Sequence, residues 1–318
     1  METKQRFYEG KRVLVTGGAG FIGSHLVAKL VELGARVTIL DNFTTGSLRN
    51  LKTVVHAINI MYADVRSSYS CCKATLKQDI IFHLAALISV PESVSNPDLC
   101  YRINIDGTQN MLDAGKKNLV STFVYASSSA VYGAKDGLCD ETDTPNPQSP
   151  YAISKYSGEQ LCQNYTSSYG MNTAILRYFN VYGERQNPQG PYAAVRAKFA
   201  HLLQAGSPLT IYGDGAQTRD FINVADVVEA NLAAGMHQAL YGEIFNVASG
   251  TSISLRELIS QLEQELGTHH TELIFEPTRP GDIQHSQAST AKLQKLLAIR
   301  LTEQAVLGWQ KAQKTATI

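Results

Sequence analysis

The fold of this chain is decided by the stretch GGAGFIG at residues 17–23. The β-branched run RVLVT at Arg12–Thr16 precedes it, and Ile22–Leu33 then carries apolar residues at helical spacing up to Gly34. A strand that turns through glycines into a helix presents backbone N–H groups and the positive end of the helix dipole to a pyrophosphate. We therefore predict a dinucleotide-binding turn, with a purely structural glycine turn as the alternative.

An acidic residue follows the next predicted strand, Ala35–Leu40, at position 41. A carboxylate at this place accepts hydrogen bonds from an adenosine ribose and repels a 2′-phosphate, so Asp41 favours NAD over NADP. The nearby Asn42, Arg49 and Lys52 leave NADP as the alternative.

Predicted strands and helices alternate through the first half of the chain, which is typical of βαβ units. Further strands are predicted at Ile80–Leu84, Thr122–Ser127 and Thr173–Tyr178, and helices at Leu99–Lys117 and Tyr151–Tyr169. Consecutive βαβ units build a parallel sheet with helices on both faces. The predicted fold class is α/β, a doubly wound (Rossmann) sheet with a smaller, interleaved C-terminal lobe.

The second half of the chain differs in composition from the first. Residues 183–220 are rich in Gly, Pro and polar side chains, as in loops that carry binding contacts. Two later segments, Phe221–Val228 and Ile244–Val247, are predicted to return to the sheet, and Leu255–Leu266 is predicted to be an amphipathic helix.

These patterns suggest two interleaved parts. Residues 1–180 are predicted to form the NAD-binding domain, which also receives about 220–250. Residues 181–318 are predicted to form a discontinuous lobe that binds the substrate.

Composition excludes several classes of protein. The 318 residues carry 28 Lys+Arg against 28 Asp+Glu, without the basic excess of a nucleic-acid binder. No apolar stretch is long enough to span a bilayer, and the N-terminus carries no signal-peptide pattern, so we expect no membrane association and a cytoplasmic protein. The five cysteines form no CxxC pair, which favours reduced thiols and no metal site.

A serine run, a tyrosine and a lysine form the candidate catalytic group. Tyr151 and Lys155 are spaced to lie on one face of a predicted helix, and residues 127–129 (SSS) end a predicted strand. An ammonium group one turn away and a positively charged nicotinamide would favour a phenolate, which can exchange a proton with a sugar or alcohol hydroxyl. A Tyr-x-x-x-Lys pattern alone often occurs by chance. The serines at the end of the preceding predicted strand strengthen the catalytic interpretation.

Taken together, five motifs resemble the extended short-chain dehydrogenase/reductase superfamily, and within it the NAD-dependent nucleotide-sugar 4-epimerases. They are TGGAGFIG, FHLAA at 82–86, SSSAVYG at 127–133, YAISK at 151–155 and RYFNVYG at 177–183. The resemblance runs from about residue 11 to about residue 300.

The resemblance implies the site residues. The catalytic group would be Ser128, Tyr151 and Lys155. Cofactor contacts, which include Tyr151 and Lys155, would also come from Gly17, Gly20, Phe21, Ile22, Gly23, Asp41, Asn42, Asp64, Val65, Leu84, Ala85 and Ala86. Substrate contacts would come from Ser127, Ser129, Asn180, Ala194, Val195, Lys198, Arg219, Arg279, Asp282 and Ser286. The arginines suit a diphosphate because their planar fork binds phosphate through paired hydrogen bonds.

The resemblance also implies a reaction: oxidation of the sugar at C4 by tightly bound NAD, rotation of the 4-keto sugar, and return of the hydride. Related dehydratases carry Thr-Asp-Glu where this chain has Ser128, Ser129 and Ala130, which disfavours loss of water. A decarboxylase or dehydratase, or a dinucleotide-binding scaffold without catalysis, are the alternatives.

Substrate size and assembly follow from the same resemblance. Ser286, four positions after Asp282, would flank the sugar C2 substituent, and its small side chain leaves room for an N-acetyl group. UDP-GlcNAc/UDP-GalNAc are therefore expected, with UDP-Glc/UDP-Gal also open and the base not fixed with certainty. Pairing through residues 99–117 and 151–169 would give a homodimer.

Overall fold

The computed structural model describes residues 2–135, 137–188, 195–268, 272–278 and 284–299. A parallel sheet of seven strands forms the centre, in the order β12-β7-β5-β4-β1-β2-β3. The order reverses between β1 and β4, which is the switch point of a doubly wound sheet, where ligands bind beyond the carboxyl ends of the strands. The predicted fold class is confirmed.

The strands of this sheet are short, and those in its centre are almost wholly buried. They are β1 (Arg12–Thr16), β2 (Arg36–Asp41), β3 (Ile58–Tyr62), β4 (Ile80–His83), β5 (Thr122–Ser128), β7 (Asn172–Tyr178) and β12 (Glu243–Val247). Their β-branched and aromatic residues suit a sheet that is buried on both faces.

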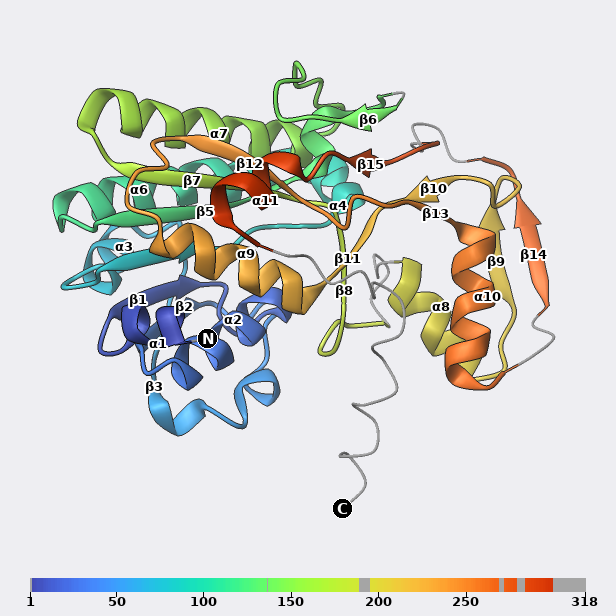
Figure 1. Cartoon of the computed structure of the whole chain (residues 1–318), viewed down its shortest axis with the longest axis horizontal. Helices are drawn as coiled ribbons and strands as arrows, with labels where there is room; N and C mark the ends of the chain where they lie inside the picture. The colour runs from blue at the N-terminus through green and yellow to red at the C-terminus, as the bar shows by residue number, and fades with distance from the viewer. Residues whose placement is uncertain (1, 136, 189–194, 269–271, 279–283, 300–318) are drawn as a thin grey trace.

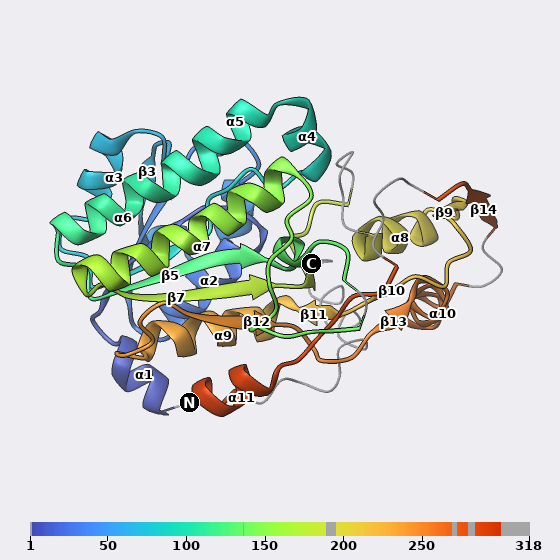
Figure 2. The same ribbon diagram turned by 90° about the horizontal axis from the view of Figure 1, so that it is seen from above.

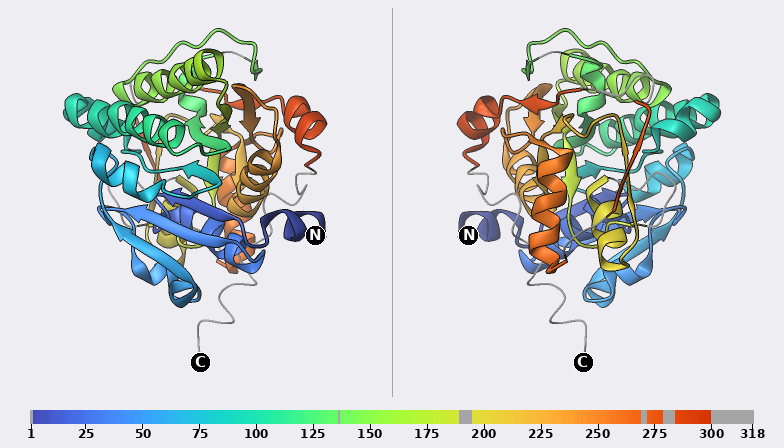
Figure 3. Two further views of the ribbon diagram at one scale, coloured as in Figure 1. Left: turned by 90° about the vertical axis from the view of Figure 1, so that its left-hand side faces the viewer. Right: turned by 90° about the vertical axis from the view of Figure 1, so that its right-hand side faces the viewer.

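Helices cover the two faces of the sheet. One face carries α2 (Phe21–Glu32) and α9 (Val224–Met236), with α1 (Glu2–Tyr8) and α11 (Ala291–Leu297) packed on α9. The other face carries α3 (Ser68–Ala74), α6 (Gly107–Lys117) and α7 (Pro150–Tyr169). Figure 3 shows α6 and α7 on the opposite side of the sheet from α9.

The alternation of side chains along each strand produces two separate cores. In β1, Val13 and Val15 pack into the core under α2 and α9, whereas Leu14 packs into the core under α3, α6 and α7. Successive residues of a strand point to opposite faces, so an uninterrupted apolar strand serves both cores.

A smaller lobe lies beyond the carboxyl ends of the strands (Figures 1 and 2). It has its own apolar core and consists of α8 (Val195–Gln204), β9 (Leu209–Tyr212), α10 (Leu255–Leu266) and β14 (Leu273–Glu276). Short strand pairs connect it with the sheet domain: β8 (Asn180–Tyr182) with β11 (Phe221–Asn223), β10 (Thr218–Arg219) with β13 (Ile253–Ser254), and β6 (Leu138–Cys139) with β15 (Gln287–Ala288). Several predicted site residues lie at the carboxyl ends of the strands and on these connecting segments.

One sequence prediction needs correction. Phe221–Val228 does not return to the central sheet, because Phe221–Asn223 pairs with β8 and Val224 begins α9. The helical stretch predicted near Leu99–Lys117 is confirmed: it consists of α5 (Pro97–Tyr101), a π-helical turn at Arg102–Asp106 and α6, which follow one another without a break. A further short helix, α4 (Val90–Ser95), precedes them. Leu255–Leu266 is confirmed as a helix. Among the described residues, no helix has the length and apolar character needed to cross a membrane.

Candidate active site

The glycine turn between β1 and α2 is closely packed. Gly17 has φ +68°, and a Cβ added to it would lie 2.9 Å from the Ala85 nitrogen. A Cβ on Gly23 would lie 2.1 Å from the Gly17 carbonyl oxygen, well inside any real contact. Gly20 caps the N-terminus of α2, next to Phe21 and Ile22 in its first turn. The turn therefore brings backbone N–H groups to the point where a pyrophosphate would bind.

Gly23→Ala is expected to remove the dinucleotide, because the new methyl group would displace the backbone of Gly17. The measurement is the NAD content of the purified protein, with a thermal unfolding curve to confirm folding. Gly170→Ala is the control: Gly170 has a positive φ, +66°, which Gly23 does not, but its Cβ would meet nothing within 4 Å, so it tests a strained glycine replacement far from the turn. Full NAD content in the Gly23 variant would contradict the assignment of this turn.

Asp41 lies buried at the end of β2 and faces the glycine turn. Its carboxylate accepts hydrogen bonds from the backbone N–H of Ala19 at 2.9 Å and of Phe43 at 2.8 Å. A carboxylate has about four acceptor positions, so two are free for a ribose diol. The position next to the turn fits the predicted role of Asp41.

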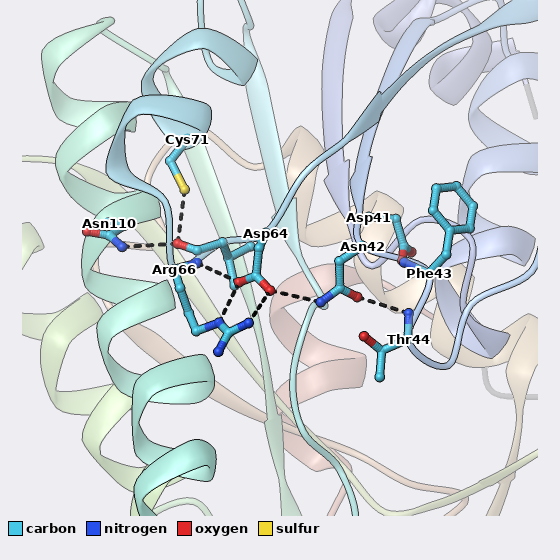
Figure 4. A network of polar contacts seen from close by, with 9 residues as sticks. Asp41, Asn42, Phe43, Thr44, Asp64, Arg66, Cys71 and Asn110 are labelled. Carbon is cyan, nitrogen blue, oxygen red and sulfur yellow. Dashed lines mark hydrogen bonds and ion pairs between the residues drawn. The ribbon is translucent and has the colours of Figure 1, made fainter.

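The adenosine end of the predicted site continues through a polar chain (Figure 4). Asn42 Nδ2 donates to Asp64 Oδ2 at 2.9 Å, and Arg66 binds both oxygens of Asp64 at 2.9 and 2.8 Å. Arg66, chiefly by these hydrogen bonds, lowers the pKa of Asp64 to about 2. Asp64 is therefore ionised at neutral pH and holds the amide of Asn42 at the end of β2.

Val65 directly follows Asp64 at the adenosine end of the predicted site. Its side chain is buried, and its carbonyl accepts hydrogen bonds from Cys71 Sγ at 3.2 Å and Asn110 Nδ2 at 3.0 Å. The segment after β3 is thus fixed against α3 and α6, and the three predicted residues of this end, Asn42, Asp64 and Val65, lie together.

Residues 84–86 lie across the glycine turn, after β4. Thr16 Oγ1 accepts from the backbone N–H of Leu84 at 3.2 Å and Ala85 at 3.1 Å, while His83 Nδ1 lies 2.8 Å from the same hydroxyl. Burial, with the charge of Lys155 as a second cause, lowers the pKa of His83 to about 3. His83 is therefore a neutral core residue that orders the segment of Leu84, Ala85 and Ala86, and not a base.

The residues of the candidate catalytic group come from two elements, β5 and α7. Ser149 caps α7 by accepting from Ala152 N at 3.1 Å, which starts the helix so that Tyr151 and Lys155 share one face. Lys155 Nζ donates to the Ala126 carbonyl at 2.8 Å and lies 5.9 Å from the centre of the Tyr151 ring. Two elements, β5 and α7, thus hold the lysine in place.

The pKa values of these groups are shifted in opposite directions. Burial raises the pKa of the half-buried Tyr151, and the nearby hydroxyl of Ser128 acts against this rise. Burial lowers the pKa of Lys155 to about 8, so its ammonium form still predominates at neutral pH. Ser128 is half-buried at the end of β5 and also accepts from Ala130 N at 3.2 Å. The arrangement is that of a tyrosine acid/base supported by a serine and a lysine.

A buried ion pair next to this group, one helical turn after Lys155, was not predicted from the sequence. Arg177 on β7 binds both carboxylate oxygens of Glu159 on α7, at 2.8 and 2.7 Å, and both side chains are almost fully buried. Burial lowers the pKa of Arg177, but hydrogen bonds and charge from Glu159 outweigh it and hold the pKa above its usual range. Glu159 also accepts from Ser127 Oγ at 2.5 Å. The Ser127 hydroxyl therefore points into the core, and Ser127 is left out of the substrate contacts proposed below.

A second missed residue lies in the π-helical turn. The buried Asn104 accepts from Leu87 N at 2.8 Å and donates to Leu87 O at 3.0 Å and Ser154 Oγ at 2.9 Å. It joins the segment after β4 to the catalytic helix. π-helical turns are frequent at functional sites, but an asparagine inside an otherwise helical pattern gives no sequence signal for one.

The predicted substrate residues form a second group beside the sheet edge. Asn180 Nδ2 donates to the Asp220 carbonyl at 2.8 Å, and Ser286 N donates to the Thr218 carbonyl at 3.2 Å. Asn180, Arg219 and Ser286, which are far apart in sequence, are thus brought onto adjoining segments. Of the other predicted substrate residues, Ser129 begins the turn after β5, and Val195 and Lys198 lie in the first turn of α8. The remaining three, Ala194, Arg279 and Asp282, lie outside the described residues.

Cysteines and acidic residues do not build a metal site in the described part of the chain. Within it, no three or more His, Cys, Asp or Glu side chains gather closely enough to hold an ion. All five cysteines are free thiols.

Comparison with known proteins connects this geometry with a family. The model of the NAD dependent epimerase/dehydratase family matches residues 13–248. A putative UDP-glucose 4-epimerase of Methanocaldococcus jannaschii is 42% identical over 287 residues, which cover 89% of this chain and 92% of that protein. A UDP-N-acetyl-alpha-D-glucosaminuronate decarboxylase of Bacillus cytotoxicus is 39% identical over 263 residues, 80% of each chain.

Solved structures give the same result. The UDP-N-acetylglucosamine 4-epimerase of Methanobrevibacter ruminantium, in complex with UDP-N-acetylmuramic acid, superposes with a TM-score of 0.90 at 37% identity, covering 96% of this chain and 99% of that one. The glycine turn, Asp41 and the Ser128–Tyr151–Lys155 group all lie at the carboxyl edge of the central sheet, an arrangement that suits NAD, the cofactor of the family. The chain belongs to the NAD-dependent epimerase/dehydratase family.

Proposed function

We propose that this protein is an NAD-dependent 4-epimerase of UDP-sugars. The observation that carries the proposal is the group of Ser128, Tyr151 and Lys155 at the carboxyl edge of β5, with Ser129 and Ala130, not carboxylates, beside it. That group moves a proton at a sugar hydroxyl but contains no additional acid for eliminating water.

The residues divide the chemistry between them. NAD, when bound, accepts the C4 hydride and returns it. Tyr151 takes the proton of the 4-hydroxyl and gives it back, Ser128 donates to the phenolate oxygen, and Lys155 supplies the positive charge that favours the phenolate. Lys155 is held by the Ala126 carbonyl at 2.8 Å, so its charge stays near the reacting oxygen in both half-reactions.

The sugar must present both faces of C4 while the nucleotide stays bound. Asn180 and Arg219, with Arg279 and Asp282, are proposed to hold the nucleotide through its diphosphate. The segment of Ala194, Val195 and Lys198 is proposed to line the uracil side. Residues 1–180 with about 220–250 would then form the NAD domain, and residues 181–318 mainly the nucleotide-sugar lobe. We further propose a cytoplasmic homodimer that pairs through residues 99–117 and 151–169.

A decarboxylase is the second candidate, because the Bacillus cytotoxicus relative at 39% identity carries that name. Its substrate is a uronic acid, so a carboxylate would have to be bound near C4. Release of CO2 from a UDP-uronic acid, without epimer formation, would favour this candidate over the first.

The test is product analysis after incubation of the purified protein with UDP-GlcNAc and, separately, with UDP-Glc, without added NAD. Formation of UDP-GalNAc would support epimerisation, retained NAD and a pocket that accepts an N-acetyl group. Formation of UDP-Gal alone would support the reaction and contradict the N-acetyl specificity. Absence of both products, even with NAD supplied, would contradict the proposal.

Ser286 is proposed to set the size of the sugar pocket. Ser286→Tyr should lower kcat/KM for UDP-GlcNAc about 10- to 100-fold and leave that for UDP-Glc within a few-fold, because the ring would occupy the place of the N-acetyl group. Gln284→Tyr, which adds the same ring at an exposed position of the same segment, is the control. Equal losses on both substrates would contradict this role.

A further inference from the structure

One buried carboxylate near the substrate residues has no part in the reaction just described. Asp220 lies between β10 and β11 and is 0% exposed. Oδ1 accepts from Ser249 N and Ser249 Oγ, both at 2.8 Å, while Oδ2 accepts from Gly250 N at 3.1 Å and Ala288 N at 3.2 Å. The side chain therefore binds two segments that are distant from it in sequence.

The backbone of Asp220 binds a third segment. Its carbonyl accepts from Asn180 Nδ2 at 2.8 Å and from Asn180 N at 3.2 Å. Asn180, Arg219 and Ser286 come from different parts of the chain. Asn180 binds the Asp220 backbone, and Arg219 directly precedes Asp220. Ser286 lies two residues before Ala288, whose N–H binds the Asp220 carboxylate.

We propose that Asp220 is the positioning residue that assembles the nucleotide-sugar half of the site. It fixes Asn180, Arg219 and Ser286 relative to one another before the substrate binds. The inference rests on the proposed function, because it takes these three residues as the contacts of a nucleoside diphosphate sugar.

Only an ionised carboxylate suits this place. All four partners are N–H or O–H donors, and a carboxylate is an acceptor at both oxygens. An asparagine would turn an NH2 group toward some of these donors and leave them unsatisfied. Burial raises the pKa of Asp220 to about 6 against the opposing hydrogen bonds, so the side chain still carries its charge at neutral pH.

The surrounding contacts extend the same junction. Gln287 Nε2 donates to the Gly250 carbonyl at 2.8 Å, and Thr218 N donates to the Gln284 carbonyl at 2.9 Å. The segment that carries Ser286 is therefore held at both ends. Gln287 binds the Gly250 segment, which the Asp220 carboxylate also binds, and Gln284 binds Thr218, two residues before Asp220. Loss of Asp220 should loosen the substrate half and leave the NAD half, which lies at the carboxyl ends of β1, β2 and β4, intact.

The experiment compares Asp220→Asn with the wild-type protein and with Asp214→Asn, an exposed aspartate of the preceding loop that accepts from Ala216 N. We expect the Asp220 variant to raise KM for the UDP-sugar, and Kd for UDP measured by calorimetry, about tenfold or more. Its kcat should stay within about threefold, its NAD content should be unchanged, and Asp214→Asn should match the wild type.

Two outcomes would overturn the proposal: an unchanged Kd for UDP, or a parallel loss of NAD and kcat, which would indicate a general structural role. If Asp220→Asn does not fold, Ser249→Ala, which removes one donor to Oδ1, replaces it and should weaken UDP binding to a smaller extent. A wild-type protein that binds UDP but converts no UDP-hexose would count against the proposed reaction. The ratio of the UDP affinities of the wild-type and Asp220→Asn proteins tests the role of Asp220 independently of that reaction.

Discussion

Replacing Tyr151 by phenylalanine is expected to reduce kcat for the UDP-sugar by about 10²- to 10⁴-fold, the range by which a positioned acid/base accelerates a reaction. The variant keeps the ring and loses only the phenolic oxygen that faces Ser128. Since the lysine is held independently by the Ala126 carbonyl, the helix and the rest of the crevice should keep their geometry.

The measurement is single-substrate kinetics together with the NAD content and thermal unfolding of each protein. Tyr69→Phe is the matched control: Tyr69 is exposed on α3, and its contact with Lys73, whose ammonium lies over the ring, needs no hydroxyl. A Tyr151 variant that retains NAD and turns over at the wild-type rate would show that another group moves the proton.

Glu159→Gln is expected to lower the free energy of unfolding by about 3–5 kcal/mol, the cost of leaving one partner of a buried ion pair without its countercharge. Arg177 has 1% of its side chain exposed, so water cannot replace the lost carboxylate charge. The guanidinium also lies 4.6 Å from the ring centre of Tyr132, whose hydroxyl donates to Asn246. The disturbance should therefore spread across the carboxyl ends of β5, β7 and β12.

Urea unfolding measures this effect, with two comparisons. In the triple variant Glu159→Leu/Arg177→Met/Ser127→Ala no charge or hydroxyl of the cluster is left unpaired, and stability should recover to within about 2 kcal/mol of the wild type. Glu32→Ala breaks the exposed pair Lys29–Glu32, joined at 2.8 Å, and should cost no more than about 0.5 kcal/mol. A Glu159 variant as stable as the Glu32 variant would refute the account of the buried pair.

Much of the dinucleotide half could be predicted from sequence because its determinants are local. The glycines of residues 17–23, the strand before them and the helix after them are contiguous, and Asp41 follows the next strand directly. Tyr151 and Lys155 are likewise one helical turn apart. In such cases spacing along the chain fixes spacing in the structure.

The errors arose where partners are distant in sequence. Phe221–Val228 has the apolar residues of a strand, but its partner is β8, and the tertiary contacts of Val224–Met236 with the sheet make the rest a helix. The serine run also predicts Ser127 as a site residue beside Ser128, whereas alternation along β5 directs its hydroxyl to Glu159 in the core.

The sequence by itself therefore determined the fold class, the glycine turn between a strand and a helix, and the place of Tyr151 and Lys155 on one helix face, because each depends on neighbours within a few residues. Only the tertiary structure showed that Glu159 and Arg177 form one buried pair, and that Asp220 joins the segments of Asn180, Ser249 and Ala288. A buried charge is stable only where distant segments supply its partners, and those partners are chosen by the packing of the whole chain.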